Sequence, residues 1–330
     1  MSGVRLGFTI GTWGPSALGP AEQAELAQEA ERLGYDSVWA SEAYGADPGA
    51  VLTWLAAHTT RLGLGAGVLQ ATARGPVTAA LLAATVDNLS GGRFRLGFGA
   101  SGPQVVEAWH GRPYTRPLET VRETVGIVRA ALAGEPVRHG PGEPLKPTIR
   151  PVQERLPVYV AAMGPRAIAL AGEIADGWLP MHCPPSYLAE GKALLGPVAP
   201  GFDVAPMLLT YVDEDVEYAR DVLRPMLAIY LGGMGSREAN FYNRLAVRLG
   251  FADAATRVQE LYLSGRRGEA MDALPDALID EMTLCGPPSR VAARLSEYAE
   301  AGATTIITGH AASSLPERVD QLRLLAELAA

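Results

Sequence analysis

Two glycine-containing loops are the first candidates for chemistry in this sequence. The stretch GFGASG, residues 97–102, fits the pattern G-x-G-x-x-G and follows the apolar run RFRL. A dinucleotide-binding loop with this pattern also opens a helix and is followed, about 20 residues later, by an acidic residue at a strand end. Here the residue at that distance is Glu119, which begins a predicted helix instead. The Rossmann interpretation is therefore disfavoured, and the loop is either a plain turn or one wall of another cofactor site.

A second loop of the same kind follows the strand-like run LPVYVAA. The strand is expected to end at Ala162, and Pro165 suits the first position of a helix. The exposed N–H groups at that helix start, near Arg166, would receive a phosphate group. Neither loop alone is enough to identify a ligand-binding site. Together, on neighbouring units of one fold, they predict a site for an elongated, phosphate-bearing small molecule.

Alternating strand and helix patterns position these two loops. Residues 21–33 illustrate the helical pattern, with Leu26, Ala30 and Leu33 on one face and Gly34 at the end. Strands that are apolar on both faces and separated by helices indicate a parallel sheet, and eight such units are enough to close a barrel. We therefore predict an α/β fold, namely a (β/α)₈ TIM barrel. Its strands are expected within residues 4–10, 36–41, 61–68, 93–99, 156–162, 176–181, 202–212 and 303–308.

Two connections are too long to be simple turns. Residues 134–155 contain five prolines and fit neither a regular helix nor a strand. Residues 231–288 have helical periodicity but no predicted strand, and they delay the eighth strand. Because no repeat or low-complexity linker marks a boundary, we expect one domain spanning residues 1–330, with these two segments as insertions.

The composition limits the class of partner. The chain has 330 residues, 48% of them hydrophobic, which is typical of a globular protein with a large core. Its formal net charge of −8 opposes binding to nucleic acids or anionic membranes. Cys183 and Cys285 form no C-x-x-C pair, and no histidine motif indicates a metal. Without a signal-peptide pattern or a long apolar run, we expect a cytoplasmic protein with a small-molecule substrate.

Six segments, in order over nearly the whole chain, match a known pattern. They are GYDSVWASEAYG, TTRLGLGAGVLQATARGP, AATVDNLSGGRFRLGFGASGPQVVEAW, LPVYVAAMGPRAIALAGEIADGWLP, LGGMGSREANFYNRLAVRLGF and LCGPPSRVAARLSEYAEAGATTI. Through them the sequence resembles the bacterial luciferase-like monooxygenase superfamily, in the branch that uses the deazaflavin coenzyme F420. The resemblance implies a TIM barrel with a cofactor cavity at the carboxyl ends of the strands. It also implies a non-proline cis peptide bond after the third strand, here Gly67–Val68, backing the tricyclic ring.

The resemblance also assigns cofactor-site residues, position by position. Glu42, at the end of the second predicted strand, takes the place of an acidic cofactor-site residue. Because a buried, unpaired carboxylate is costly, we expect Glu42 to accept hydrogen bonds from the cofactor or from a nearby backbone. Gly67 and Val68 would support the ring. The tail or ring edge would meet Ala100, Ser101 and Gly102, and the phosphate would meet Met163, Gly164, Pro165 and Arg166.

Aromatic and proton-donating side chains near the same edge complete the predicted site. Trp13 on the first loop and Tyr44 near the second would stack against the cofactor or the substrate, since hydride transfer needs a flat contact that excludes water. Further aromatic candidates are Trp39 and Trp178. The candidates for supplying a proton are Glu42, Tyr44 and His182.

Two positions depart from the glucose-6-phosphate dehydrogenases of this branch. Those enzymes carry a histidine next to the acidic residue and a glutamate near the end of the first strand. This sequence has Ala43 and Trp13 at those places. Oxidation of a sugar phosphate is therefore disfavoured.

The leading hypothesis is a coenzyme F420-dependent oxidoreductase, acting as an F420H2-dependent reductase of an activated C=C or C=N bond in a small organic substrate. One alternative is an FMN-dependent monooxygenase on the same barrel. A second is a non-catalytic deazaflavin-binding protein, and a third is a nicotinamide reductase. The family resemblance also leads us to expect a homodimer.

Overall fold

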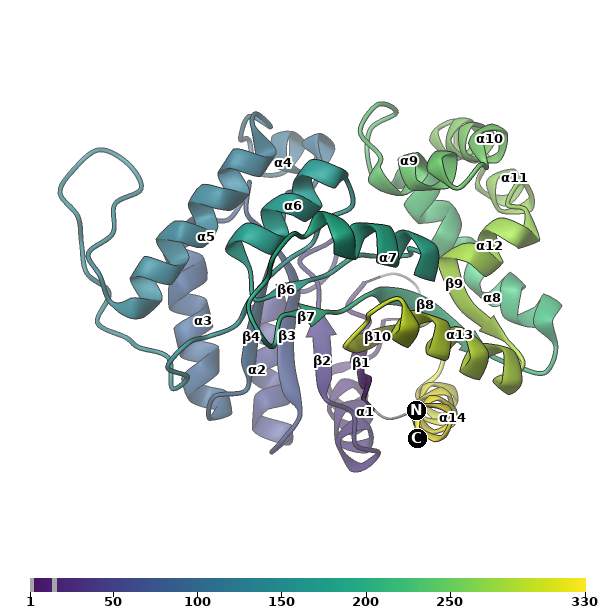
Figure 1. Ribbon diagram of the computed structural model, residues 1–330, viewed down its shortest axis with the longest axis horizontal. Coiled ribbons are helices and arrows are strands. Elements are labelled where there is room, and N and C mark those ends of the chain that lie inside the picture. The colour runs from purple at the N-terminus through teal and green to yellow at the C-terminus, as the bar shows by residue number, and fades with distance from the viewer. Residues whose placement is uncertain (1–2, 14–16) are drawn as a thin grey trace.

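Ten parallel strands form one curled sheet that is flanked by helices (Figure 1). The computed structural model describes residues 3–13 and 17–330. Neighbouring strands follow the order β7-β6-β5-β4-β3-β2-β1-β10-β8-β9. The strands are β1 (Arg5–Thr9), β2 (Ser37–Ala40), β3 (Gly63–Gln70), β4 (Phe94–Gly99), β5 (Val158–Val160), β6 (Gly177–Trp178), β7 (Asp203–Val204), β8 (Met207–Val212), β9 (Thr283–Gly286) and β10 (Thr305–His310).

Helices follow most strands, and many of them begin with proline. Proline suits this position because its fixed φ matches the helix and the first-turn N–H has no helical partner. The predicted helix at residues 21–33 is confirmed, and Gly34 follows it with a φ of +84°. No helix in the described ranges is both long and apolar enough to cross a membrane. The helices are α1 (Pro20–Arg32), α2 (Pro48–His58), α3 (Pro76–Ser90), α4 (Pro103–Ala108), α5 (Pro117–Ala133), α6 (Pro165–Ile174), α7 (Pro185–Leu194), α8 (Val216–Ala228), the π-helix η1 (Ile229–Gly233), α9 (Phe241–Arg248), α10 (Ala252–Leu263), α11 (Arg267–Asp272), α12 (Asp276–Met282), α13 (Pro288–Glu300) and α14 (Leu315–Ala329).

The predicted α/β fold with a parallel sheet is confirmed, but the predicted count of eight strands is not. Every predicted run contains a strand. The seventh run is divided into β7 and β8 at Ala205 and Pro206, since proline cannot donate to a strand ladder. In addition, β9 lies within residues 231–288, for which no strand was predicted. A four-residue apolar run next to helices gives no periodic signal that separates a strand from a helix.

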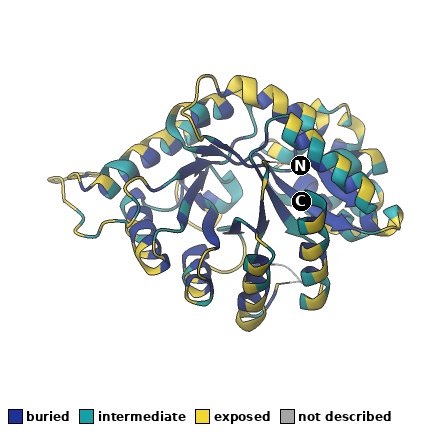
Figure 2. Cartoon of the chain, turned by 60° about the horizontal axis from the view of Figure 1, so that its bottom comes forward, coloured by how far each residue is buried: buried dark blue, intermediate teal, exposed yellow. Residues whose placement is uncertain are grey.

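The core has two parts, one inside the curled sheet and one between the sheet and the helices. The strands are mostly buried, whereas the helices bury one face and expose the other (Figure 2). Inside the sheet the packing is tight: a Cβ on Gly65 would lie 2.2 Å from the Trp39 ring, so only glycine leaves room for that indole. The inner cluster consists of Trp39, Tyr159, Leu179, Ala205, Met207 and Ile307.

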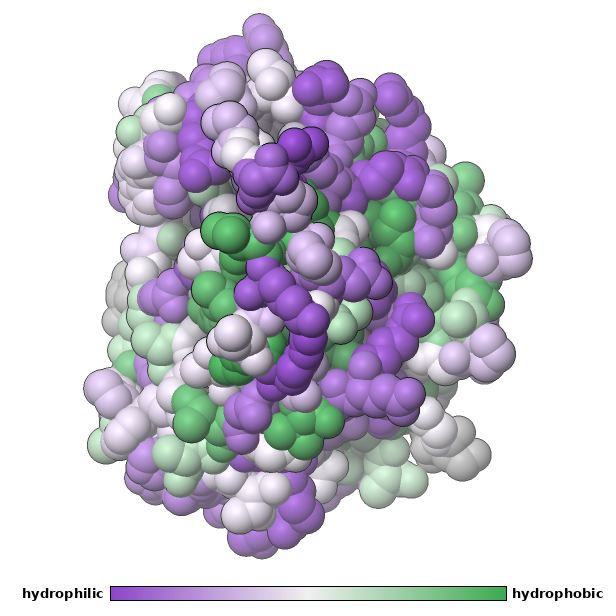
Figure 3. All heavy atoms as spheres, turned by 90° about the vertical axis from the view of Figure 1, so that its left-hand side faces the viewer, coloured by the Kyte–Doolittle hydropathy of each residue, from purple (hydrophilic) through white to green (hydrophobic). Residues whose placement is uncertain are grey.

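Residues 134–155 form an irregular excursion, as the prolines predict. Its regular pairing is one antiparallel bridge between Val137 and Leu145. The buried Asp87 of α3 holds the end of the excursion by accepting hydrogen bonds from the N–H groups of Val152, at 2.7 Å, and Gln153, at 3.0 Å. The excursion and α5 lie on a side of the molecule where hydrophilic side chains surround scattered hydrophobic ones (Figure 3).

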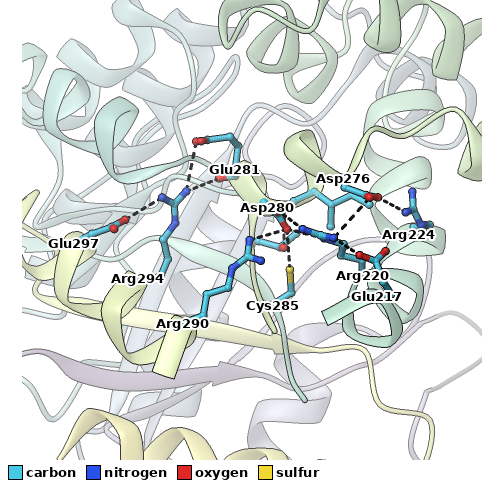
Figure 4. Close-up of polar contacts among 12 residues, drawn as sticks. Glu217, Arg220, Arg224, Asp276, Asp280, Glu281, Cys285, Arg290, Arg294 and Glu297 are labelled. Carbon is cyan, nitrogen blue, oxygen red and sulfur yellow. Dashed lines mark hydrogen bonds and ion pairs between the residues drawn. The ribbon is translucent and has the colours of Figure 1, made fainter. Parts of the chain in front are cut away.

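Residues 231–288 supply a separate group of helices, α9 to α12, beside one end of the sheet (Figure 1). An ion-pair network ties this group to the fold (Figure 4). Asp280 accepts hydrogen bonds from Arg220 of α8, at 2.6 Å, and forms an ion pair with Arg290 of α13, at 2.8 Å. Burial by itself would raise the pKa of Asp280, but these two arginines outweigh burial and hold the pKa below its usual range. Arg224 binds Asp276 in the same network.

Replacing Asp280 with alanine should lower the free energy of unfolding by about 2 kcal/mol, because Arg220 and Arg290 would both lose a charge-assisted contact in a largely buried site. Urea unfolding followed by circular dichroism measures this change. The control is Asp221→Ala, which removes an exposed partner of Arg224 and should change stability by less than about 0.5 kcal/mol. Wild-type stability in Asp280→Ala would contradict the anchoring role.

Candidate active site

A cavity of about 630 Å³ lies at the carboxyl ends of the strands. Strand β3 and the loops after β1, β2, β4, β5 and β6 form part of its wall, and residues of β8, β10, α4, α5, α8, η1, α9 and α14 also line it. All the residues that the sequence predicted for the site line this cavity, except the further aromatic candidate Trp178. They are Trp13, Trp39, Glu42, Tyr44, Gly67, Val68, Ala100, Ser101, Gly102, Met163, Gly164, Pro165, Arg166 and His182. Their roles stay predictions, but their convergence on one cavity is a property of the fold.

A bulge in β3 forms one wall of the cavity. The peptide bond between Gly67 and Val68 is cis, as the resemblance implied, and the register with β4 shifts there. The Val68 methyl groups lie against β4, where a Cβ on Gly97 or Gly99 would come within 3.0 Å or 2.7 Å of them. A Cβ on Gly67 would lie 3.1 Å from the Trp39 ring. The glycines of the G-x-G pattern therefore make room for the bulge of the neighbouring strand.

The Glu42 carboxylate is held by its neighbours rather than left unpaired. It accepts hydrogen bonds from the backbone N–H of Gln70, at 2.7 Å, and from two guanidinium nitrogens of Arg74, at 2.6 and 2.9 Å. The expectation of a nearby backbone donor is confirmed. The ion pair with Arg74 was missed, although Arg74 stands in the segment TTRLGLGAGVLQATARGP. Arg74 also binds Asp47 at the start of α2, so it links two loops of the rim.

The loop of residues 100–102 is fixed by side chains from outside it. Thr72 donates to the Ala100 carbonyl at 2.8 Å, and the Tyr114 hydroxyl donates to the Ser101 carbonyl at 2.9 Å. Ser101 has a left-handed φ of 56°, which is uncommon for a residue other than glycine. The side-chain oxygen of Gln104, which also lines the cavity, is buried without a hydrogen-bond partner among the described residues. No pattern in the sequence singled out Gln104.

The start of α6 forms a second loop of the rim. Its N-cap residue, Gly164, offers no side-chain hydrogen bond, so the first N–H groups of the helix are open to a ligand. Arg166 in the first turn is exposed and forms no ion pair with any residue in the described ranges. The Met163 carbonyl before the helix accepts a hydrogen bond from Tyr187. This arrangement fits an anionic group, as predicted.

Three aromatic side chains cluster on another part of the wall. His182 is fully buried, and its ring lies edge-to-face with Tyr230 at 4.4 Å and near Tyr242 at 5.8 Å. Burial lowers the pKa of His182 to about 3, so this imidazole is neutral at physiological pH. Tyr230 belongs to η1 and Tyr242 to α9. Neither tyrosine was predicted, because helical periodicity alone does not show which buried face meets a cavity.

The other aromatic candidates divide between the mouth of the cavity and the core. Tyr44 lies edge-to-face with Trp13 at 5.8 Å and with the exposed Trp109 at 5.4 Å. Trp39 and Trp178 are fully buried, and each indole N–H donates within the fold, to Ser37 and to the carbonyl of Ala162. Trp178 does not line the cavity and is a core residue. Trp39 touches the cavity from the inner cluster.

Nucleophilic catalysis by a thiol and metal-ion chemistry find no support among the described residues. Burial raises the pKa of the Cys183 thiol to about 12, which makes it a poor nucleophile. In the part of the chain that the structure describes, no three histidine, cysteine or acidic side chains meet as metal ligands do. The site is therefore an apolar cavity with a few fixed polar groups, which is typical of organic cofactors and substrates.

Comparison with known proteins gives the family. The family model described as luciferase-like monooxygenase matches residues 1–305. The chain belongs to the luciferase-like monooxygenase family. The resemblance found in the sequence segments is thereby confirmed for this luciferase-like protein.

Relatives of this luciferase-like protein extend over nearly its whole length. It is 37% identical, over 331 residues, to a Mycobacterium tuberculosis protein provisionally named a coenzyme F420-dependent oxidoreductase; the match covers 93% of this chain and 95% of the relative. It is 28% identical to the 5,10-methylenetetrahydromethanopterin reductase of Methanolobus tindarius, covering 87% of this chain and 89% of that enzyme. Among solved structures, the coenzyme F420-dependent tetrahydromethanopterin reductase of Methanopyrus kandleri has the same fold, with a TM-score of 0.79, 24% identity, and coverage of 99% and 98%.

Acid should destabilise the protein through His182. Its pKa is about 3 in the folded chain, whereas an unfolded histidine titrates near about 6.5, so the unfolded state takes up the proton first as the pH falls. The stability contribution is complete above about pH 6.5 and is lost progressively toward about pH 3. The loss of unfolding free energy between about pH 7.5 and about pH 5 should be about 2 kcal/mol smaller in His182→Asn, which cannot titrate and tolerates a left-handed backbone.

Urea unfolding at the two pH values measures this difference. Each protein is compared with itself at the two pH values, so a pH-independent loss of unfolding free energy caused by the substitution cancels. His110→Asn, at an exposed histidine, is the control. A part of the acid sensitivity should persist in His182→Asn, since burial also lowers the pKa of His310 to about 3. The same pH dependence in wild type and His182→Asn would contradict a buried neutral imidazole.

Proposed function

We propose that this luciferase-like protein is a coenzyme F420-dependent oxidoreductase. The observation that carries the proposal is the shared cavity, which joins the Gly67–Val68 bulge, the loop of residues 100–102 and the start of α6. A flat ring on the bulge would place a phosphate-bearing tail along the two loops. The name of the Mycobacterium tuberculosis relative, 37% identical over 93% of this chain, supports the same cofactor.

The residues along this path fit the proposed cofactor. The buried Gln104 oxygen has no hydrogen-bond partner among the described residues and would accept a hydrogen bond from a polar tail. The uncapped start of α6 and the guanidinium of Arg166 receive the phosphate. The bound deazaflavin supplies or accepts hydride at one ring carbon. The backbone of Gly67 and Val68 supports one face of the ring and excludes water from it.

Glu42 is a positioning residue in this proposal. Its carboxylate already accepts hydrogen bonds from Gln70 and Arg74, and its own N–H donates to the Val68 carbonyl at 3.1 Å. These bonds join the loop after β2 to the bulge in β3. Glu42 therefore holds the wall on which the ring rests, and the Arg74 pair makes it a weaker candidate for supplying a proton than the sequence indicated.

The finer hypothesis is the F420H2-dependent reduction of an activated C=C or C=N bond. Such a reduction needs a proton near the atom that receives hydride, and the candidate donors are Tyr44 and His182. Tyr44 lies at the open mouth, 42% exposed, where water can relay a proton. His182 is neutral and can donate a hydrogen bond from one ring nitrogen.

We also propose that the curled sheet closes as a barrel and that the whole chain is one domain. Backbone hydrogen bonds on both sides of β7 and β8 support closure. The N–H of Ala205 donates to the Trp178 carbonyl of β6, while the carbonyl of Val204 accepts from the Thr304 N–H on the other side. β7 and β8 would then act as the one strand predicted there, with β9 added outside. The homodimer expected from the family stays a prediction.

A parallel titration with F420 and FMN tests the cofactor. F420 should bind at least about tenfold more tightly than FMN, which is about 1.4 kcal/mol. Fluorescence quenching of either chromophore measures the affinity. Tighter binding of FMN would favour the alternative monooxygenase. Binding of neither, in a protein shown to be folded by circular dichroism, would contradict the proposed cofactor site.

Arg166→Ala should weaken F420 binding about tenfold, because it removes a charge-assisted contact with the phosphate. It should leave binding of the deazaflavin ribitol compound, which lacks the phosphate and tail, unchanged. The same fluorescence titration measures both ligands. The control is Arg116→Ala, at an exposed arginine that pairs with Glu119 and lies outside the cavity. Equal losses for both ligands would remove Arg166 from the phosphate site.

A further inference from the structure

His182, Tyr230 and Tyr242 form a compact aromatic group, called here the His–Tyr cluster. The two tyrosine rings lie edge-to-face at 4.8 Å, and His182 touches both. The three residues come from different elements, namely the loop after β6, η1 and α9, and all three line the cavity. Such a convergence of polar aromatic side chains on one cavity needs an explanation beyond packing.

The polar atoms of this cluster are left almost without partners. Neither ring nitrogen of the buried His182 makes a hydrogen bond to any residue in the described ranges. The Tyr230 hydroxyl also makes no hydrogen bond to a described residue, although this oxygen is not one of the fully buried unpaired atoms. The Tyr242 hydroxyl lies 3.4 Å from the sulfur of Met181, which is a weak acceptor. Because buried polar groups in native proteins are nearly always paired, the cluster is short of a hydrogen-bonding ligand.

The cluster occupies the part of the cavity that faces the bulge. β3 and β8 are four positions apart in the sheet order, with β2, β1 and β10 between them, so in the curled sheet they lie on opposite walls. His182 belongs to the β8 side, since its N–H donates to the Met207 carbonyl at 2.9 Å. A flat ring on Gly67 and Val68 therefore turns its free face toward the cluster.

Apolar side chains from β8, α8, α9 and the segment after η1 line the same cavity. They are Met207, Leu209, Met226, Met234 and Phe241. Methionines are flexible and adapt to irregular apolar shapes. This part of the cavity therefore combines the polar His–Tyr cluster with flexible apolar side chains, and we call these side chains the adaptable wall.

The π-helical turn is the device that presents Tyr230. A π-helix carries an extra residue per turn, and such turns are frequent at functional sites. Here the turn is pressed against α10, where a Cβ on Gly232 or Gly233 would lie 2.4 Å from an atom of Tyr262. Glycine at these two positions allows the close approach and fixes the turn that carries Tyr230 into the cavity.

We propose that the His–Tyr cluster binds the carbonyl oxygen of an uncharged, largely apolar substrate. The proposal rests on the function proposed above and adds the class of substrate. A phenol and a neutral imidazole each donate one hydrogen bond, which suits an oxygen with two lone pairs. The cluster carries no charge, so it disfavours a carboxylate, whose burial needs a nearby cation. Hydrogen bonds to the oxygen also make a conjugated double bond electron-poor, in keeping with an activated C=C bond.

The test uses cyclohex-2-en-1-one as the probe and cyclohexene as its hydrocarbon match, with the protein loaded with oxidised F420. Calorimetry measures both affinities, and difference infrared spectroscopy measures the carbonyl stretch of the bound enone. Wild type should bind the enone with a stretch shifted to lower frequency than in an apolar solvent. Tyr230→Phe should weaken enone binding at least fivefold, return the stretch toward its value in that solvent, and leave cyclohexene binding unchanged.

Two further variants guard against a folding defect in Tyr230→Phe. Tyr242→Phe should cause a smaller change in the same direction. Tyr218→Phe, at a half-exposed tyrosine of α8, should change neither affinity nor frequency. A carbonyl frequency that does not respond to Tyr230→Phe or Tyr242→Phe would overturn the proposal, as would the absence of enone binding to F420-loaded wild type.

Failure of this proposal can be separated from failure of the proposed function. If F420 binds and the enone does not, the cofactor assignment stands and the His–Tyr cluster has another role. If F420 does not bind, the enone titration is run on the free protein. A Tyr230-dependent frequency shift there would support the cluster without the cofactor, and its absence would overturn both.

Discussion

The site depends on the close packing of the β3 bulge against β4. The carbonyl of Ala66 and the methyl groups of Val68 occupy the space into which a Cβ of Gly97 would project, at 2.3 Å and 3.0 Å. Because β4 has glycine at this position, the β3 bulge can pack directly against β4 while Gly67 and Val68 line the cavity. The same bulge accepts the N–H of Glu42 on its other side. The ends of β2, β3 and β4 therefore form one rigid wall.

The residues that the sequence predicted for this wall do line the cavity, but one of the reasons was incomplete. The G-x-G pattern pointed to a ligand loop, and its last residues do line the cavity. Its first two glycines, however, serve strand packing, which a single-strand pattern cannot reveal. The strand and helix order followed from hydrophobic periodicity, and the carboxyl-edge position of the site followed from that order. The ion pair between Glu42 and Arg74 could not be predicted from the sequence, since Arg74 lies 32 residues away and has no periodic relation to Glu42.

The wall that contains His182, Tyr230 and Tyr242 was harder to predict than the wall formed by the ends of β2, β3 and β4, for physical reasons. In η1 and α9 the buried residues follow a helical pattern, and the same pattern fits a tyrosine in the core and a tyrosine at a cavity. His182 was a candidate from its place after a strand, but its complete burial depends on Tyr230 and Tyr242, which arrive from residues 229–248. Likewise, β9 depends on pairing with β8 and has no local signal of its own.

The two walls come from different stretches of the chain, and this has an evolutionary consequence. The bulge, the loop of residues 100–102 and the α6 start all precede residue 182, whereas the adaptable wall is built mainly from residues 207–242. Under the proposed function, substitutions in the later stretch would alter which substrates are accepted and leave the wall proposed to hold the cofactor unchanged. Proteins with this fold could therefore acquire new substrates by mutation of residues 207–242, while the wall built from the earlier residues stays the same.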